Sequence, residues 1–535
     1  MIKKCFIFMV GIAVCSLLKA QATVADEDRY GCTTITVGKK ASVDGSVFTS
    51  HTDDSHRSRS NILITPAANH KQGKTQTMYR REWCETTKMK SYADVPVGEM
   101  PQALQTYAFF NTAYPCMNEK QLGIGESTFG GRSELKSDVG LIDCQRLCGL
   151  LLARCATARE AIRTAGLLLE EFGWIDAGEC LTIADKTEVW HLEIVGPGQG
   201  KKGAVWAAQR VPDEHISVNA NASRIRQIDK NKPDEFMFSK NIFEVAIENG
   251  WWKPDELPFE FCYAYAPTTR ASIACRRREW RVFSLLAPSL GLDPLSENYP
   301  FSVKPDKPVS LQDMVTVFQD YYEGTPFDMR KNITVADDSG KMVISPIANP
   351  FMVRDELKLH RVNGGWFELG ERTIAVRFTM YATIIQCRDR LPDEIGGVCW
   401  LALDNPAASI YVPIYCNVTD LPKTYQTDGR ITGFSKDAAW WAFNRLSSLA
   451  TRRWGDTQKD LQGVWKPLQT EWFENQSVVE EKALKLYDPK KNNDPKKNKK
   501  LLDYLTKYCS DCGNTAVSKA WDLGDALWNK YDGMW

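Results

Sequence analysis

The stretch that decides the fold is CTTITVGKKASVDGSVFTSHTDD, residues 32–54. Residues 33–37 are mostly β-branched and predict a strand, Asp44-Gly45 is a tight-turn dipeptide, and residues 46–52 predict the returning strand. Closing this turn places Cys32 opposite roughly residue 52, give or take about two residues of register. We therefore expect three polar side chains beside Cys32 at the same end of the hairpin: His51, Asp53 and Asp54.

Cys32 has the chemistry of a nucleophile if a group nearby accepts its proton. Cleavage between Gly31 and Cys32 would free an α-amino group with a reference pKa of about 7.7–8. That amine could shuttle the proton, so one residue would supply both nucleophile and base. On these local features alone, a buried or disulfide-bonded cysteine at the start of a strand is the favoured interpretation.

The N-terminal residues predict export. Lys3 and Lys4 precede the apolar residues 5–18, and Ala20-Gln21-Ala22 fits the cleavage pattern of a secretory signal. The apolar run is short for a membrane span. We expect residues 1–22 to be a removed signal peptide, residues 23–31 to be a short leader removed before the nucleophile, and the mature protein to be periplasmic or secreted.

The composition is that of a globular protein, with 43% hydrophobic and 25% charged residues in 535. Lys plus Arg and Asp plus Glu number 67 each, so the basic excess typical of nucleic-acid binding is missing. The sequence contains six His and no HExxH, P-loop or GxGxxG motif. We expect no cofactor, no metal, no nucleic-acid partner and no membrane partner after signal removal. Formation of a homo-oligomer is compatible with the sequence.

Strand groups alternate with helix groups along the rest of the chain, which predicts an α+β layered body. Thr157 with Glu160 has the form of a capping box that opens a second helix within residues 143–172. Cys144, Cys148 and Cys155 are expected to pack in the core from one helix face, and Cys509 and Cys512 to form a structural disulfide or a free pair. Further strands are predicted at residues 182–184, 189–195, 204–209, 372–386 and 398–403, and further helices at 276–286 and 437–452.

Residues 32–46 resemble the opening of the cysteine-nucleophile dipeptidase family, which includes the secernins and belongs to the Ntn-hydrolase superfamily. The similarity covers nearly the whole mature chain, through residues 118–120, 125–128, 208–213, 216–221, 278–281, 322–326 and 425–430. The resemblance implies a four-layer αββα Ntn-hydrolase fold with additional C-terminal helices. It also implies self-processing (autoprocessing) or leader removal before Cys32, and hydrolysis of a small peptide substrate.

The same resemblance assigns roles to individual residues. Cys32 is the nucleophile and its freed amine the base, Asp54 orients that amine, and Asn221 donates to the oxyanion. His51 stands three residues before Asp54, where related acylases have Arg, and it either holds the thiolate or only caps the strand.

Three further residues complete the expected site. Thr128 falls where the acylases carry an oxyanion-hole Asn, and Glu126 beside it is a catalytic or substrate-binding candidate. Arg278 looks like the late catalytic Arg of the family, although Arg276 and Arg277 leave that assignment ambiguous.

The favoured function is therefore an exported cysteine dipeptidase that acts through a thioester acyl-enzyme. One alternative is an N-acyl amidase of the bile-salt hydrolase or penicillin V acylase type. A second is a non-catalytic exported binding protein on the same fold, supported mainly by His51 in place of Arg. Residues 32–486 are expected to form the catalytic domain, and residues 487–535 a Lys-rich loop and a C-terminal helical tail.

Overall fold

The computed structural model describes residues 31–55, 58–85, 90–255, 258–353, 356–357, 370–489 and 498–535. The predicted signal peptide and all but the last residue of the predicted leader lie outside the described residues, as do residues 490–497 of the Lys-rich loop. In the described parts of the chain, no helix has the length and apolar character needed to cross a membrane.

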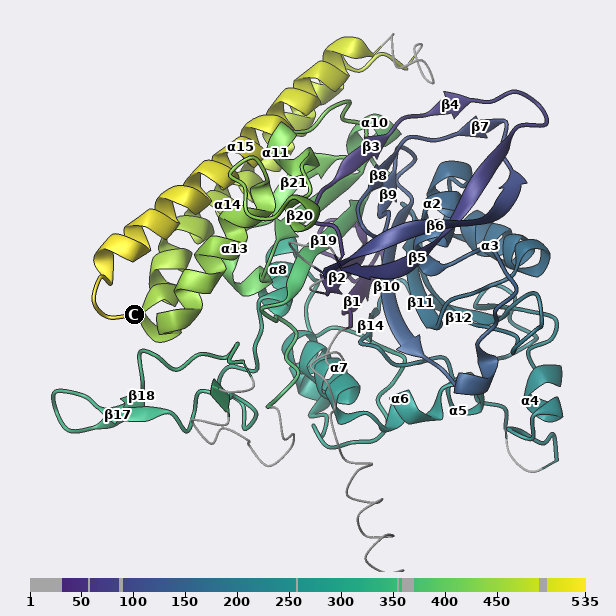
Figure 1. Ribbon diagram of the computed structural model, residues 1–535, viewed down its shortest axis with the longest axis horizontal. Helices are drawn as coiled ribbons and strands as arrows, with labels where there is room; N and C mark the ends of the chain where they lie inside the picture. Colours follow the sequence, from purple (N-terminus) through teal and green to yellow (C-terminus); the bar gives the residue numbers. More distant parts are fainter. Residues whose placement is uncertain are drawn as a thin grey trace, which may run out of the picture.

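Two antiparallel sheets lie face to face in the middle of the molecule (Figure 1). Strand β2 of the first sheet packs against β10, β11 and β12 of the second. In spatial order, the first sheet consists of β16 (Ser302–Val303), β14 (Ile216–Asn219), β1 (Thr34–Val37), β2 (Val47–Asp54), β19 (Thr379–Cys387), β20 (Val398–Leu403) and β21 (Val412–Tyr415). The second consists of β15 (Phe236–Phe238), β13 (Val205–Val211), β12 (Val189–Val195), β11 (Gly178–Ala184), β10 (Gly123–Gly130), β9 (Met117–Asn118), β8 (Phe109–Asn111) and β3 (Leu63–Thr65).

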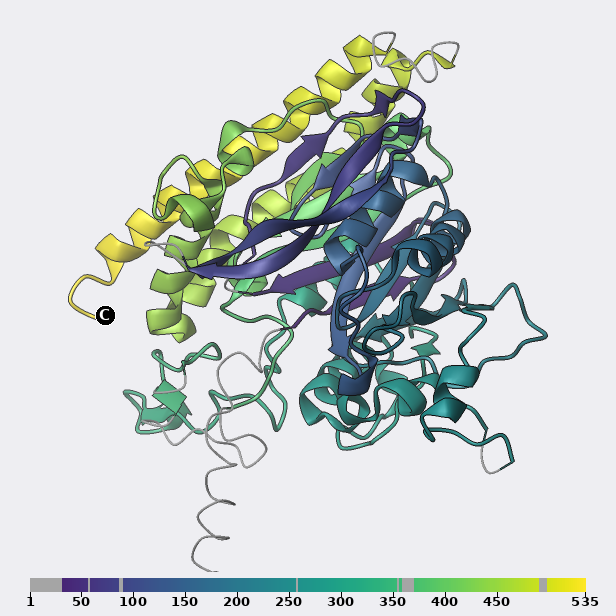
Figure 2. The ribbon, with the colours of Figure 1, turned by 45° about the vertical axis from the view of Figure 1, so that its right-hand side comes forward.

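Helices cover the outer face of each sheet, and the turned view shows both covers (Figure 2). Helices α13 (Ala439–Ala450), α14 (Trp454–Leu486) and α15 (Lys499–Lys530) form one cover, with α13 against β20 and α15 against β21. Helices α2 (Cys144–Arg154) and α3 (Ala158–Phe172) form the other, with α3 against β11 and β12. The molecule is thus a mixed α+β protein, as the sequence predicts.

The remaining elements belong neither to the two large sheets nor to their helical covers. The long hairpin of β5 (Thr75–Glu85) and β6 (Lys90–Pro101) crosses in front of the sheets in Figure 1. The others are β4 (Ala68–Asn69), β7 (Gln105–Thr106), β17 (Thr334–Ala336), β18 (Met342–Ile344), α4 (Glu244–Glu248), α5 (Phe261–Tyr265), α6 (Pro267–Ala271), α7 (Ile273–Leu286), α8 (Leu311–Phe318), α10 (Asp393–Gly396), α11 (Lys423–Gln426) and α12 (Gly429–Thr432).

The predicted hairpin of β1 and β2 is confirmed. Val37 pairs with Phe48 and an isolated bridge joins Thr33 to Thr52, so Cys32 lies opposite Asp53, one residue from the predicted position. Every residue of β2 is buried, although most of its side chains are polar. Buried polar groups need partners, and β2 has them: the Ser50 hydroxyl donates to the Ile35 carbonyl at 2.7 Å, and the Thr49 hydroxyl donates to the Thr182 carbonyl at 3.0 Å.

Three local predictions need correction. The predicted strand 372–386 begins only at Thr379, because residues 372–378 make other contacts; the Ala375 N–H, for example, donates to the Asp320 carbonyl. Cys155 lies beyond the end of α2 in extended backbone, so it does not share a helix face with Cys144 and Cys148, although all three are buried. The helix start at Thr157 is confirmed, but the Glu160 carboxylate accepts from the Ala156 N–H rather than closing the box on Thr157.

Candidate active site

Cys32 lies at the start of β1 with its side chain between the two sheets. Alternate residues of a strand share a face, so Cys32, Asp53 and His51 are on the same side of the β1–β2 hairpin. Glu126 approaches from β10 of the other sheet, and the Cys32 thiol donates to its Oε2 at 3.3 Å. The Nε2 of His51 lies 3.2 Å from the same carboxylate oxygen. Residues from both sheets therefore meet at one buried thiol.

The surroundings of Cys32 keep its thiol protonated. Burial raises the pKa of the Cys32 thiol well above its usual value, and the negative charge of Glu126 raises it further, followed by those of Asp53 and Asp54. A thiolate is the reactive form of cysteine. To act as the nucleophile that the sequence predicts, Cys32 would therefore need a base close to its sulfur.

Glu126 is one half of a buried carboxyl pair. The Thr128 Oγ1 lies 3.0 Å from Glu126 Oε1 and 2.8 Å from Glu179 Oε1, so it bridges the two side chains. Burial opposes ionisation of Glu126, but His51, together with hydrogen bonds from Glu179 and Cys32, keeps the pKa of Glu126 below its usual value. Burial and the charge of Glu126 raise the pKa of Glu179 well above its usual value. The pair therefore carries one negative charge, and the Thr128 hydroxyl is turned towards it.

Asp54 points to the opposite face of the hairpin from Asp53, because consecutive strand residues alternate. Its carboxylate forms a 2.5 Å ion pair with Arg372 and accepts from the Thr379 hydroxyl at 2.7 Å. The same Arg372 Nη2 donates to the carbonyl of Gly31 at 3.0 Å. Arg372 thus connects Asp54 to the peptide bond that precedes Cys32. The sequence analysis did not single out Arg372, which it placed in a predicted strand.

Asn221 lies directly against Gly31. A Cβ atom added to Gly31, which has φ +153°, would come within 2.2 Å of the Asn221 Oδ1. The Asn221 Nδ2 donates to the Thr128 carbonyl at 2.7 Å, which leaves the second hydrogen of that amide nitrogen for another acceptor. Its own backbone is in the left-handed region at φ +63°, which Asn tolerates better than most residues.

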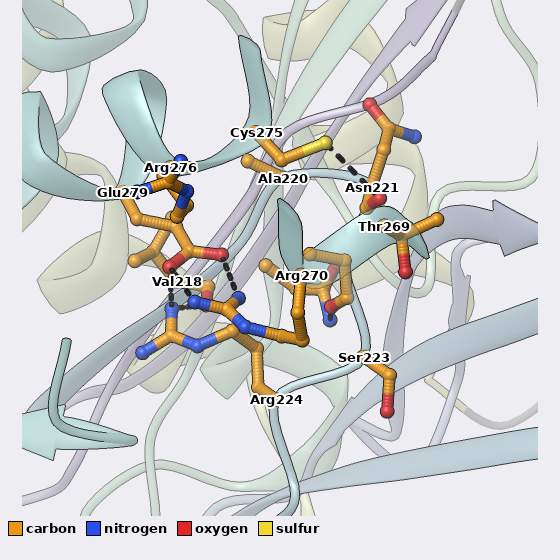
Figure 3. A network of polar contacts seen from close by, with 12 residues as sticks. Val218, Ala220, Asn221, Ser223, Arg224, Thr269, Arg270, Cys275, Arg276 and Glu279 are labelled. Atoms are coloured by element: carbon orange, nitrogen blue, oxygen red, sulfur yellow. Dashed lines mark hydrogen bonds and ion pairs between the residues drawn. The ribbon is translucent and has the colours of Figure 1, made fainter. Parts of the chain in front are cut away.

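Arg278 of α7 connects Cys32 to the Asn221 loop. Its Nη1 donates to the Cys32 carbonyl at 2.9 Å, and its Nη2 donates to the Asn221 Oδ1 at 2.8 Å. Two further contacts lie near this loop (Figure 3). Arg224 and Arg270 both form ion pairs with Glu279, and the Cys275 thiol donates to the Asn221 carbonyl. Of the three neighbouring arginines at 276–278, Arg278 is therefore the one placed at the site.

A cavity of about 300 Å³ opens beside the thiol, at the small end of the usual range for ligand pockets. Its lining joins the predicted residues Cys32, Asp54, Thr128 and Asn221 to side chains that the sequence analysis did not single out, among them Arg81 and Tyr114. The full lining is Gly31, Cys32, Asp53, Asp54, Ser55, Ser58, Arg81, Tyr114, Thr128, Phe129, Asn221 and Thr269.

The donor atoms around Glu126 could also hold a metal ion. One atom each of Cys32, His51 and Glu126 lie within 4.8 Å of one another, and so do one atom each of Glu126, Cys144 and Glu179. Sulfur, imidazole and carboxylate ligands suit zinc. An ion in the first group would bind the thiol sulfur and occupy the proposed nucleophile.

Comparison with known proteins identifies the family. The sequence model described as peptidase family C69 matches residues 31–467. A protein of Latilactobacillus sakei named "Probable dipeptidase" is 25% identical over 465 residues, which are 85% of this chain and 88% of that protein. "Probable dipeptidase B" of Lactococcus lactis is 26% identical over 75% of this chain and 78% of its own length. "Dipeptidase A" of Lactobacillus helveticus is 23% identical over 81% and 83%.

The buried thiol, its carboxylate neighbours and the adjoining cavity thus belong to a peptidase, a hydrolase of peptide bonds. The chain is a member of peptidase family C69, and the matched region begins at the residue before Cys32. The family resemblance recognised in the sequence is confirmed.

Proposed function

We propose that this protein is an exported cysteine dipeptidase with an N-terminal nucleophile on the αββα Ntn-hydrolase fold. The observation that carries the proposal is the position of Cys32. Its thiol lies on the wall of a cavity of dipeptide size, next to the Asn221 amide and directly after a peptide bond held by Arg372. The dipeptidase names of relatives at 22–26% identity support the substrate class.

The first step is removal of the leader at the Gly31–Cys32 bond. The Cys32 sulfur adds to the Gly31 carbonyl carbon, the C–N bond breaks, and the thiol proton passes to the departing amine. Water then hydrolyses the thioester and leaves a carboxylate on Gly31. Arg372 supports this step because it already donates to the Gly31 carbonyl oxygen, on which negative charge develops.

The mature enzyme uses the freed amine as its base. The amine takes the thiol proton as sulfur attacks the scissile carbonyl, and it returns the proton to the leaving amino group. The free N–H hydrogen of Asn221 and a backbone N–H bind the oxyanion. Water hydrolyses the thioester in the last step. Asp54 orients the amine, and Arg278 keeps the Asn221 amide oxygen turned away from the oxyanion by bonding it.

His51 takes a different part from the Arg that stands in its place in related acylases. It lies 3.2 Å from Glu126 and edge-on to the rings of Tyr114 and Tyr381. We propose that it keeps Glu126 ionised and fixed beside the thiol. This gives His51 a place in a working site and weakens the alternative of a non-catalytic binding protein.

The test compares the wild-type chain with Cys32→Ala and Cys32→Ser. We expect a mature wild-type chain that begins at Cys32 and hydrolyses dipeptides, and a Cys32→Ala chain that keeps residues 23–31 and shows no hydrolysis. Intact mass, N-terminal sequencing and a panel of dipeptides and N-acyl amino acids provide the readouts. Activity on N-acyl amides with none on dipeptides would favour the amidase alternative, and a fully active chain that begins near Thr23 would contradict the N-terminal nucleophile.

A further inference from the structure

We propose that Asp53 receives the α-ammonium group of the substrate's first residue, so that this site selects peptides with a free N-terminus. This inference rests on the proposed function and names the substrate class of the same cavity. It differs from the role of Asp54, which faces the other side of the hairpin and is bonded by Arg372 and Thr379.

Asp53 is a buried carboxylate with an unused acceptor. Its side chain lines the cavity and the residue is 1% exposed. Its Oδ1 accepts from the Ser58 hydroxyl at 3.3 Å, whereas its Oδ2 has no hydrogen-bond partner among the residues that the structure describes. Buried acceptors of this kind are rare in folded proteins and call for a specific reason. A ligand that carries an N–H donor into the cavity supplies one.

The hairpin places this acceptor at the right distance from the chemistry. Asp53 lies opposite Cys32, and directly opposite side chains on one face have Cβ atoms about 4.5–5.5 Å apart. In a peptide, the α-nitrogen is only about 2.5 Å from the carbonyl carbon of its own residue. When that carbon meets the Cys32 sulfur, the α-ammonium is therefore within reach of the Asp53 carboxylate. An acyl group on this nitrogen would remove its positive charge and would add atoms where the nitrogen approaches Asp53.

The charges around Asp53 fit an ammonium ligand. Burial raises the pKa of Asp53 to about 7, while His51 and Arg81 lower it and Glu126 raises it. A cation bound at Oδ2 would offset the cost of burial and favour the ionised carboxylate. Arg81 lines the same cavity, where its Nη2 donates to the Tyr114 hydroxyl at 3.0 Å.

The competing role for Asp53 is to hold the freed amine of Cys32, its neighbour across the hairpin. The two roles differ in which substrates they affect. A partner of the Cys32 amine serves every substrate, whereas a receptor for the substrate ammonium serves only substrates that carry one.

The experiment uses two substrates that differ in one amino group, alanyl-alanine and propionyl-alanine. Both are assayed with the mature wild type and with Asp53→Asn. The matched control is Asp404→Asn, which alters another buried aspartate with an unbonded Oδ2 among the described residues, but outside this cavity. Intact mass confirms that each chain begins at Cys32, and thermal unfolding confirms that each is folded.

We expect the wild type to prefer alanyl-alanine by at least about 100-fold in kcat/KM, which is the scale for losing one partner of a buried charge pair. Asp53→Asn should lose that factor on alanyl-alanine and keep the wild-type rate on propionyl-alanine within about threefold, and Asp404→Asn should retain the preference. An equal loss on both substrates would assign Asp53 to the nucleophile and overturn the inference while the dipeptidase function stands.

Two further outcomes separate the inference from the proposed function. A wild type that hydrolyses both substrates equally well would overturn the ammonium site alone. A wild type that hydrolyses neither would overturn the proposed function as well. If Asp53→Asn does not fold, Asp53→Ser is assayed in its place on the same two substrates, and the same outcomes decide between the two roles.

Discussion

The Glu126 carboxylate accepts a hydrogen bond from the Cys32 thiol at 3.3 Å, so the proposed nucleophile has a negative charge as its partner. This arrangement favours the thiol over the thiolate. On the proposed mechanism, the thiol therefore needs a base close to the sulfur to take its proton. It also gives the first prediction.

Replacing Glu126 by Gln should lower the pKa of the Cys32 thiol, because the charge that raises it is removed. Alkylation of Cys32 by iodoacetamide at pH 7 should become faster, by about tenfold for each unit of the change. The rate is followed against pH by mass spectrometry of the peptide that contains Cys32. Glu214→Gln, on the exposed surface beside Lys40, is the control and should leave the rate unchanged. Slower alkylation of the Glu126→Gln protein would contradict the electrostatic argument.

Replacing Arg278 by Lys should weaken the connection between Cys32 and the Asn221 loop. A single ammonium group cannot reach the Cys32 carbonyl and the Asn221 amide oxygen together, as the guanidinium fork does. We expect the free energy of unfolding to fall by roughly 2–4 kcal/mol and kcat/KM to fall by at least about tenfold. Urea unfolding and dipeptide kinetics measure the two effects.

The control for that variant is Arg276→Lys. Arg276 is half-buried and its Nη1 donates to the Ser296 carbonyl, away from the thiol. It should change stability by less than about 1 kcal/mol. Equal losses in the two variants would mean that Arg278 has no special place at the site.

Replacing Gly31 by Ala should delay removal of the leader. The added Cβ would overlap the Asn221 amide, and φ +153° is strained for an L-residue, so the bond to be cut must leave its position. We expect cleavage to slow by at least about tenfold, measured by intact mass over time. Gly45→Ala has a similar backbone penalty at φ +76° but meets no atom within 4 Å, and it should be processed normally. Cleavage of Gly31→Ala at the wild-type rate would show that the observed position of Gly31 is unimportant.

Replacing His191 by Gln should make the protein less sensitive to acid. Burial lowers the pKa of His191 from 6.5 to about 3, so the folded protein keeps it neutral while the unfolded chain takes up a proton below pH 6.5. The unfolded state binds more protons in this window, and His191 therefore costs about 1.4 kcal/mol of stability for each pH unit below 6.5, down to about 3. Gln can still bond the Thr36 hydroxyl, which lies 3.1 Å from the His191 Nε2.

The measurement is the free energy of unfolding in urea at pH 6.5 and at pH 4.5. The decrease between these values should be smaller in His191→Gln than in the wild type by roughly 2 kcal/mol. His70→Gln, which alters a partly exposed histidine, should show the wild-type decrease. Equal decreases in all three proteins would exclude His191 as the acid-sensitive group.

The parts of the site that sequence could predict are the local ones. A tight-turn dipeptide between two β-branched runs defines the β1–β2 hairpin, and the hairpin alone brings His51 and Asp53 beside Cys32. The family resemblance added Glu126 and Arg278, which the fold brings within hydrogen-bond distance of Cys32. It also added Asn221, whose amide oxygen accepts from Arg278 and which lies against Gly31.

The parts that sequence could not predict depend on distant pairings. Arg372 meets Asp54 across 318 positions, and no local pattern marks it. Glu179 joins Glu126 only because β10 and β11 pair with Thr128 opposite Glu179. The same limit explains the strand predicted to start at residue 372. The apolar residues there resemble a strand, but the segment instead places the Arg372 side chain at the site.

The pairing of β2 with β19 determines when, during synthesis of the chain, β2 can take its place in the sheet. The strand that carries His51 and Asp54 has Thr379–Cys387 as its neighbour. A ribosome must therefore synthesise well over half of the protein before this strand gains its second partner. Arg372, which donates to the carbonyl of the bond that we propose is cut, arrives at the same late stage. A nascent or truncated chain would keep its leader, and the appearance of a new N-terminus at Cys32 would report that the two distant halves of the sheet have met.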